Sequence, residues 1–145
     1  MTAPHPLRIL LVEDNQGDIM LIREALSDTA MAVELSLVRN GQDAIDFLRR
    51  EGLHEKAARP DIVVLDQNLP LKNGREVLAE MRVDPSLNQI PVVVMTGSRG
   101  EPDICSLYTE GRCRYLVKPS GYLELVSLLN EIEQFAASFQ RPGER

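Results

Sequence analysis

The sequence has few cysteines, no long hydrophobic run and no excess of basic residues. Its two cysteines, Cys105 and Cys113, form no CxxC motif and have no cluster of histidines nearby. We therefore expect reduced, structural thiols in a cytoplasmic protein rather than a disulfide or a metal site. No apolar run approaches the length of a membrane span, and the opening MTAPHP lacks the basic start of a signal peptide. With a net charge of −6, neither nucleic acid nor an anionic membrane is expected as a main partner.

The length and composition suit one folded unit. The chain has 145 residues, of which 43% are hydrophobic, enough to bury one sizeable core. It contains no internal repeat and no linker. We expect a single domain over 1–145, with its core from about 7 to about 139 and flexible ends at 1–6 and 140–145.

Short apolar runs alternate with segments of helical periodicity. The runs typical of strands are LRILLV (7–12), VELSLV (33–38), IVVL (62–65), PVVVM (91–95) and RYLV (114–117). Apolar residues at helical spacing predict helices over 18–28, from 41, over 74–82, from 102, and over about 121–139. This alternation predicts an α/β fold with a doubly wound, five-stranded parallel sheet.

Polar side chains follow four of the five predicted strands. Glu13 and Asp14 follow the first strand, Asp66 the third, Thr96 the fourth and Lys118 the fifth. The carboxyl ends of parallel strands lie at one edge of a sheet, where such folds place their sites. Strand ends often simply meet solvent, but that explanation accounts poorly for three acids on strands expected to be neighbours.

The three acids predict a metal site. Close carboxylates repel one another and take up protons unless a cation lies between them. A hard divalent ion, Mg²⁺ or Mn²⁺, suits Glu13, Asp14 and Asp66, and it would keep several waters that a phosphate can displace. Asn68 is placed to add its backbone carbonyl to the ligands.

Asp66 is also a candidate nucleophile. A metal-bound carboxylate can attack phosphorus and form an aspartyl phosphate. Lys118 would offset the charge of the arriving phosphoryl group, and the hydroxyl of Thr96 would donate a hydrogen bond to one of its oxygens. The sequence therefore contains the parts of a phosphoryl-accepting site.

Four motifs follow the order and separations of one known family: LLVEDN, VVLDQNLPLKNG, VVVMTGS and YLVKP, within Leu7 to about Phe139. In these motifs the chain resembles the receiver domains of two-component response regulators. The resemblance implies the strand order 2-1-3-4-5 and a phosphoryl group supplied by a sensor histidine kinase. It also implies signalling through phosphorylation-dependent protein contacts, with no enzyme activity beyond promoting the chain's own phosphorylation and dephosphorylation. The alternative is a phosphorelay intermediate that passes phosphate to a histidine phosphotransfer protein.

The resemblance also implies roles for single residues. The acceptor, phosphoryl-binding and metal positions of the family match Glu13, Asp14, Asp66, Asn68, Thr96 and Lys118. Tyr115 would be the aromatic switch that turns inward when Thr96 moves. The peptide between Lys118 and Pro119 is implied to be cis, which proline makes affordable.

A narrower resemblance concerns the stimulus. The motif VEDNQGDIMLIREAL and the lengthened segment before the third strand resemble stand-alone receivers that serve phytochrome-type kinases. Gln67 and Ser98 occupy positions that vary in the family and line the approach to the phosphoryl group. Arg112 stands where a small residue is common, which could alter the surface near Tyr115.

The last predicted helix has a broad apolar face. It spans about half of the helix circumference, wider than the roughly 100° that one packing face needs. Either this helix is deeply seated in the domain, or part of its face binds a second copy of the chain. The residues of the possible homodimer face are Leu128, Ile132, Phe135 and Phe139.

Three other phosphate-binding classes fit less well. A haloacid-dehalogenase phosphatase carries an acid two residues after a nucleophile on its first strand, whereas this chain has Asn68 after the third strand. A flavodoxin needs a Ser/Thr/Gly loop after the first strand, where this chain has EDNQGD. A Rossmann dinucleotide site needs a GxGxxG motif, which is missing. A degenerate receiver is also disfavoured, because every chemical position is filled.

Overall fold

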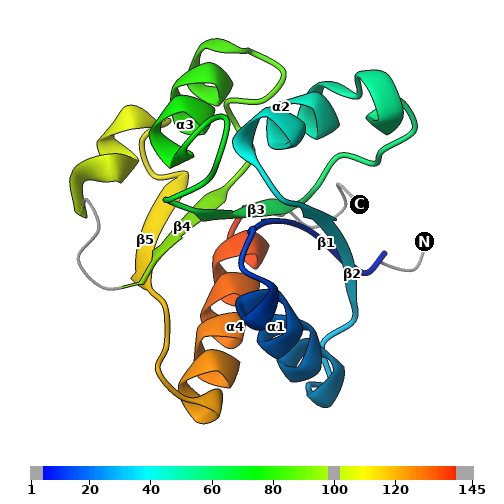
Figure 1. The fold of residues 1–145 in the computed structure, drawn as a ribbon, viewed down its shortest axis with the longest axis vertical. Helices are drawn as coiled ribbons and strands as arrows, with labels where there is room; N and C mark the ends of the chain where they lie inside the picture. The colour runs from blue at the N-terminus through cyan, green and yellow to red at the C-terminus, as the bar shows by residue number, and fades with distance from the viewer. Residues whose placement is uncertain (1–4, 98–101, 140–145) are drawn as a thin grey trace.

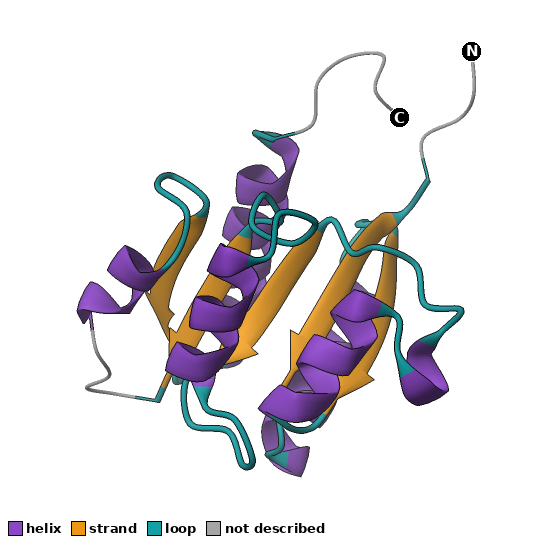
Figure 2. Cartoon of the chain, turned by 90° about the horizontal axis from the view of Figure 1, so that it is seen from above, coloured by secondary structure: helices purple, strands orange, loops and turns teal. Residues whose placement is uncertain are grey.

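A five-stranded parallel sheet forms the centre of the molecule (Figure 1). The computed structural model describes residues 5–97 and 102–139. The strands are β1 (Leu7–Val12), β2 (Val33–Val38), β3 (Ile62–Asp66), β4 (Val92–Thr96) and β5 (Cys113–Val117). They pair in parallel in the order β2-β1-β3-β4-β5, and their arrows all point the same way in Figure 2. The predicted fold class and strand order are confirmed.

Helices cover both faces of this sheet. α1 (Gln16–Asp28) and α4 (Tyr122–Ala137) lie on one face, and α2 (Gly41–Arg49) and α3 (Gly74–Val83) lie on the other (Figure 1). The segment after residue 102 forms a 3₁₀ helix, η2 (Pro102–Leu107). α2 ends where Arg50 adopts a left-handed φ of 57°, and a second 3₁₀ helix, η1 (Gly52–His54), follows.

Successive residues of the central strands alternate between two hydrophobic cores. In β1, Leu10 and Val12 face the core under α2 and α3, whereas Ile9 and Leu11 face the core under α1 and α4. Side chains on a strand point alternately to its two faces. Because helices cover both faces, the central strands need apolar residues at every position, which explains their unbroken apolar runs.

Short capped loops connect the strand ends to the helices that follow. Asn15, Asn40 and Asn73 are the N-caps of α1, α2 and α3, and each side chain accepts a hydrogen bond from the backbone N–H three residues later. Gly41 allows the loop after β3 to pack against the start of α2, because a Cβ there would lie 1.9 Å from the carbonyl oxygen of Lys72. These loops hold the carboxyl edge of the sheet in a tight arrangement.

The expectation of reduced cysteines is wrong. Cys105 in η2 and Cys113 in β5 form a disulfide, and their Cα atoms lie 5.3 Å apart, within the usual range for such a bond. η2 packs against β5, so the chain turns back on itself between the two cysteines. Tertiary packing brings the thiols together, and their spacing in the sequence carries no signal of it.

The predicted homodimer face is largely covered within one chain. Leu128, Ile132 and Phe135 have exposed fractions of 7%, 2% and 8% and belong to the core under α1 and α4. Phe139 packs against the same core, and the guanidinium of Arg112 lies 4.3 Å from its ring centroid. Burial of these three residues within the chain favours the deeply seated alternative. The homodimer face stays a prediction.

Candidate functional site

The pairing of β1 with β3 places two of the predicted acids side by side. Val12 is in register with Leu65, so the next residues, Glu13 and Asp66, leave the sheet at neighbouring positions. Both side chains are buried, with exposed fractions of 0% for Glu13 and 6% for Asp66. Two acids at the buried end of a sheet require positive charge nearby.

The pairing of β4 with β5 supplies that charge. The backbone N–H of Lys118 donates to the carbonyl of Thr96 at 2.7 Å, which fixes the lysine directly after β5. Thr96 is buried at the end of β4, beside the strand that ends in Asp66. The described residues contain no cis peptide, so the implied cis bond between Lys118 and Pro119 is wrong. Proline lowers the free energy of the cis form but does not require it.

The three acids form one cluster. Carboxylate oxygens of Glu13, Asp14 and Asp66 lie within 4.8 Å of one another. Asp14 is exposed while the other two are buried, so the cluster opens to solvent on one side. Two buried carboxylates beside an exposed one suit a hard divalent cation that keeps some of its waters on the solvent side.

Glu13 shows the electrostatic strain of this cluster. Burial is the largest effect on its carboxyl group, and the neighbouring Asp66 adds to it; together they raise the pKa of Glu13 to about 7, against the opposing effect of Lys118. Oε1 of Glu13 is buried and forms an ion pair with Nζ of Lys118 at 2.9 Å. A buried acid with two more carboxylates beside it fits a divalent cation, which would hold all three groups ionised.

Lys118 contacts three carboxylates, two of which belong to the cluster. Its Nζ lies 2.9 Å from Oε1 of Glu13, 2.8 Å from Oδ2 of Asp18 and 3.5 Å from Oδ2 of Asp66. Burial lowers the pKa of Lys118, but the contacts with Asp18 and Glu13 and the charge of Asp66 outweigh it and raise that pKa above its ordinary value. The lysine is therefore positively charged wherever the site can react.

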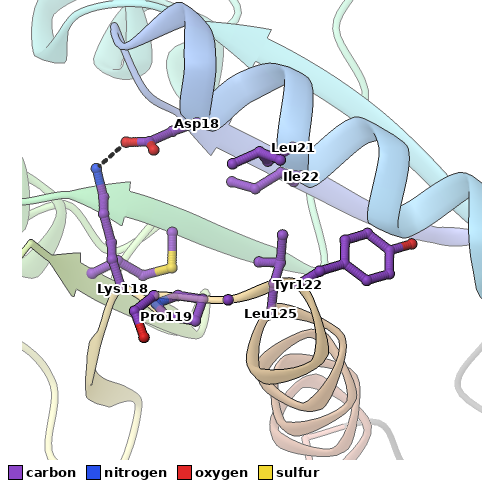
Figure 3. Close-up of a pocket in the computed structure, with 10 residues that line it drawn as sticks. Asp18, Leu21, Ile22, Lys118, Pro119, Tyr122 and Leu125 are labelled. Carbon is purple, nitrogen blue, oxygen red and sulfur yellow. Dashed lines mark hydrogen bonds and ion pairs between the residues drawn. The ribbon is translucent and has the colours of Figure 1, made fainter.

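Sequence reasoning missed Asp18. It lies in the first turn of α1, where acids are common because they interact favourably with the helix dipole. That position therefore does not mark a site by itself. Only the packing of α1 beside the end of β5 shows that Asp18 reaches Lys118 (Figure 3).

The remaining predicted residues surround the acceptor. The backbone N–H of Asn68 donates to Oδ1 of Asp66 at 3.2 Å and helps to orient that carboxylate. Gln67 is buried next to the acceptor, and Ser98 lies outside the described residues. Tyr115 is half-buried and packs against the core under α2 and α3. Its role as a switch stays a prediction.

The arrangement defines a class of site. Asp66 lies at a cluster of acids that suits a cation, faces a charged lysine and adjoins a buried threonine hydroxyl at the next strand end. An aspartate in these surroundings can accept a phosphoryl group. The family model of the response regulator receiver domain matches residues 9–130, and the chain belongs to this family.

Known relatives agree with this assignment. The chain is 42% identical over 130 residues to Response regulator Rcp1 of Synechocystis sp., which covers 90% of this chain and 88% of that protein. It is similar to the phosphorylated cyanobacterial phytochrome response regulator RcpA, with a TM-score of 0.81, 43% identity and coverage of 95% of this chain and 98% of that one. The Mn²⁺-bound form of Rcp1 gives a TM-score of 0.78 at 40% identity, covering 94% and 98% of the two chains.

The family has consequences for partners and chemistry. A receiver domain implies a cognate sensor histidine kinase, and its chemistry is limited to its own phosphorylation on an aspartate. Within residues 5–97 and 102–139, the helices are too short or too polar to cross a membrane.

Proposed function

We propose that the chain accepts a phosphoryl group on Asp66 from a sensor histidine kinase in the cytoplasm and signals through protein contacts that depend on this modification. The observation that carries the proposal is the meeting of Asp66 with Glu13, Asp14 and Lys118, which come from the ends of three strands. Their convergence supports a role for Asp66 beyond that of a polar residue at the end of a strand.

The reaction follows from the surroundings of Asp66. An oxygen of the Asp66 carboxylate attacks the phosphorus of the donor's phosphohistidine, so that a P–O bond forms and the P–N bond breaks. The electron pair of that bond leaves with the imidazole, which takes up a proton. Lys118 lies 3.5 Å from Oδ2 of Asp66, and its charge offsets that of the phosphoryl oxygens. The hydroxyl of Thr96 is placed to donate a hydrogen bond to one of them.

A divalent cation completes this site in the proposal. Glu13, Asp14 and Asp66 would hold Mg²⁺ or Mn²⁺ through carboxylate oxygens, and Asn68 would contribute its backbone carbonyl. When bound, the cation neutralises the acids and offers positive charge to the phosphoryl oxygens. The burial of Glu13 and Asp66 within one cluster of three acids supports this assignment.

The proposed output is a shift between two arrangements of the switch residues. Phosphorylation of Asp66 favours one arrangement of Thr96 and Tyr115, and a partner protein reads the altered surface. Similarity to RcpA and to the bacteriophytochrome response regulator AtBRR, at 43% and 31% identity, supports a phytochrome-type kinase as the donor. The proposed pathway is therefore one of light sensing.

Incubation with a small phosphoryl donor tests the proposal. Wild-type protein with Mg²⁺ should gain one phosphoryl group by intact mass, as an acid-stable and base-labile adduct. Asp66→Asn should gain none, and wild type should gain little in the presence of a chelator. Asp43→Asn is the matched control, because Asp43 lies in the first turn of α2 and outside the acid cluster. An adduct that persists in Asp66→Asn, or that forms equally well without metal, refutes the proposal.

A further inference from the structure

Lys118 is shared between the acceptor and a carboxylate outside the acid cluster. Its Nζ is 2.8 Å from Oδ2 of Asp18 but 3.5 Å from Oδ2 of Asp66. Figure 3 shows the Lys118 side chain extending from the end of β5 to Asp18 on α1. The ammonium group is therefore closer to Asp18 than to the residue whose chemistry it serves.

The ammonium group of this lysine is already engaged by three carboxylates. An ammonium group has three N–H donors, and three carboxylates lie within 3.5 Å of it, those of Glu13, Asp18 and Asp66. A phosphoryl group on Asp66 would bring further oxygens with negative charge. To donate to them, the ammonium must weaken one of its present contacts. The contact with Asp18 is the one that can weaken, because Asp18 lies outside the buried cluster that contains Glu13 and Asp66.

Capping and the helix dipole could by themselves explain an acid such as Asp18 in the first turn of a helix. The other helices of this chain allow a comparison. Asp18, Asp43 and Glu76 occupy the same position in α1, α2 and α3, each donating its backbone N–H to an N-cap asparagine. Glu76 returns its carboxylate to the N-cap backbone, and Asp43 contacts His54 at 3.3 Å. Capping and the helix dipole thus account for an acid at this position, but not for its contact with a lysine 100 residues away.

We propose that Asp18 is a positioning residue that competes with the phosphorylated acceptor for Lys118. In the unphosphorylated protein Asp18 holds the ammonium group toward α1, and in the phosphorylated protein the ammonium turns to the phosphoryl oxygens. Asp18 thereby lowers the affinity of the site for a phosphoryl group. This inference rests on the proposed function of Asp66.

The surroundings of the pair allow this exchange. The Asp18 side chain is 37% exposed and that of Lys118 is 18% exposed. Both line a pocket of about 220 Å³ between α1 and the loop that leads into α4. Leu21 and Leu125 are among its apolar lining residues (Figure 3). The pair can therefore separate without any rearrangement of the core.

Beryllofluoride, which binds acceptor aspartates as a phosphoryl analogue, provides the test. Its affinity in the presence of Mg²⁺ would be measured calorimetrically for wild type, Asp18→Asn and Asp43→Asn. Asp18→Asn should bind about two- to five-fold more tightly than wild type, the range expected for loss of a partly exposed ion pair. Asp43→Asn removes the same charge from the same helix position and should bind like wild type. Asp18→Ala serves as a second variant, and thermal unfolding verifies that each variant is folded.

A double-mutant cycle separates competition for the lysine from simple charge repulsion. In a Lys118→Met background, Asp18→Asn should no longer change the affinity, because there is no ammonium group to release. The Nζ resonance of Lys118 in ¹⁵N NMR should shift in Asp18→Asn and stay in place in Asp43→Asn. An Asp18→Asn affinity equal to or weaker than that of wild type overturns the inference, as does an effect that survives in Lys118→Met. If wild type itself fails to bind beryllofluoride, the proposed function fails instead.

Discussion

Replacing Glu13 by glutamine should stabilise the metal-free protein at alkaline pH. Glu13 is completely buried beside Asp66, and burial, with that neighbouring acid, raises its pKa from 4.5 to about 7. Above pH 7 the metal-free folded protein must therefore contain an ionised group in a position that disfavours its charge. Glutamine has nearly the same shape and carries no charge. Its oxygen can still accept from Lys118, and its amide can donate to Asp66.

The pKa of Glu13 sets both the size of the effect and its pH dependence. The difference between 4.5 and about 7 corresponds to roughly 3 kcal/mol of destabilisation once the group is ionised in both the folded and the unfolded state. Between these two pH values the folded state holds the proton more tightly, so the contribution of Glu13 to stability falls as the pH rises. Glu13→Gln should thus gain about 1–3 kcal/mol at about pH 8 and little at about pH 4.5.

Metal binding should show the opposite dependence on Glu13. A cation needs the ionised carboxylate, so the Mg²⁺ affinity of wild type should fall as the pH drops below about 7. Glu13→Gln should weaken Mg²⁺ binding by about ten-fold or more. Mg²⁺ should therefore raise the free energy of unfolding of wild type more than that of the variant.

Urea unfolding with a chelator or with Mg²⁺, followed by circular dichroism across this pH range, measures both effects. Glu133→Gln is the control, because Glu133 is exposed on α4; its free energy of unfolding should follow that of wild type at each pH. The reasoning is refuted if Glu13→Gln is less stable than wild type in chelator at alkaline pH. It is equally refuted if the gain does not change with pH.

Three further predictions concern the stability of the fold. The disulfide between η2 and β5 joins cysteines 8 positions apart in the sequence. Its reduction should lower the free energy of unfolding by about 2–3 kcal/mol. Free thiols detected without reductant would contradict this bond. Leu128→Ala should lower the free energy of unfolding in urea by about 2–5 kcal/mol, because Leu128 is only 7% exposed. Leu123→Ala on the same helix should change it by less than about 0.5 kcal/mol, because Leu123 is 80% exposed. Equal effects would refute the burial of α4. Gly41→Ala should destabilise by more than about 2 kcal/mol, because its Cβ would meet the carbonyl of Lys72 at 1.9 Å. Gly97→Ala is the control, because among the described residues other than its chain neighbours no atom would lie within 4 Å of its Cβ. Similar values for both glycines would refute the steric argument.

Much of the molecule follows from the sequence because its main signals are local. Apolar runs and helical spacing identify the alternating elements, and alternation alone leads to a parallel sheet. A parallel sheet brings its strand ends to one edge whatever the details of packing. The convergence of Glu13, Asp14, Asp66 and Lys118 could therefore be predicted from their positions directly after three strands, and the structure brings these four residues together.

Tertiary packing decided the remaining features. The contact between Asp18 and Lys118 depends on how α1 lies beside the end of β5, and the disulfide depends on η2 folding back onto that strand. Burial of the broad face of α4 depends on how deeply the helix sits against the sheet. Each of these results from the distance and orientation between elements far apart in the chain. Local periodicity determines which faces are apolar and where strands end, but it does not determine which surfaces meet.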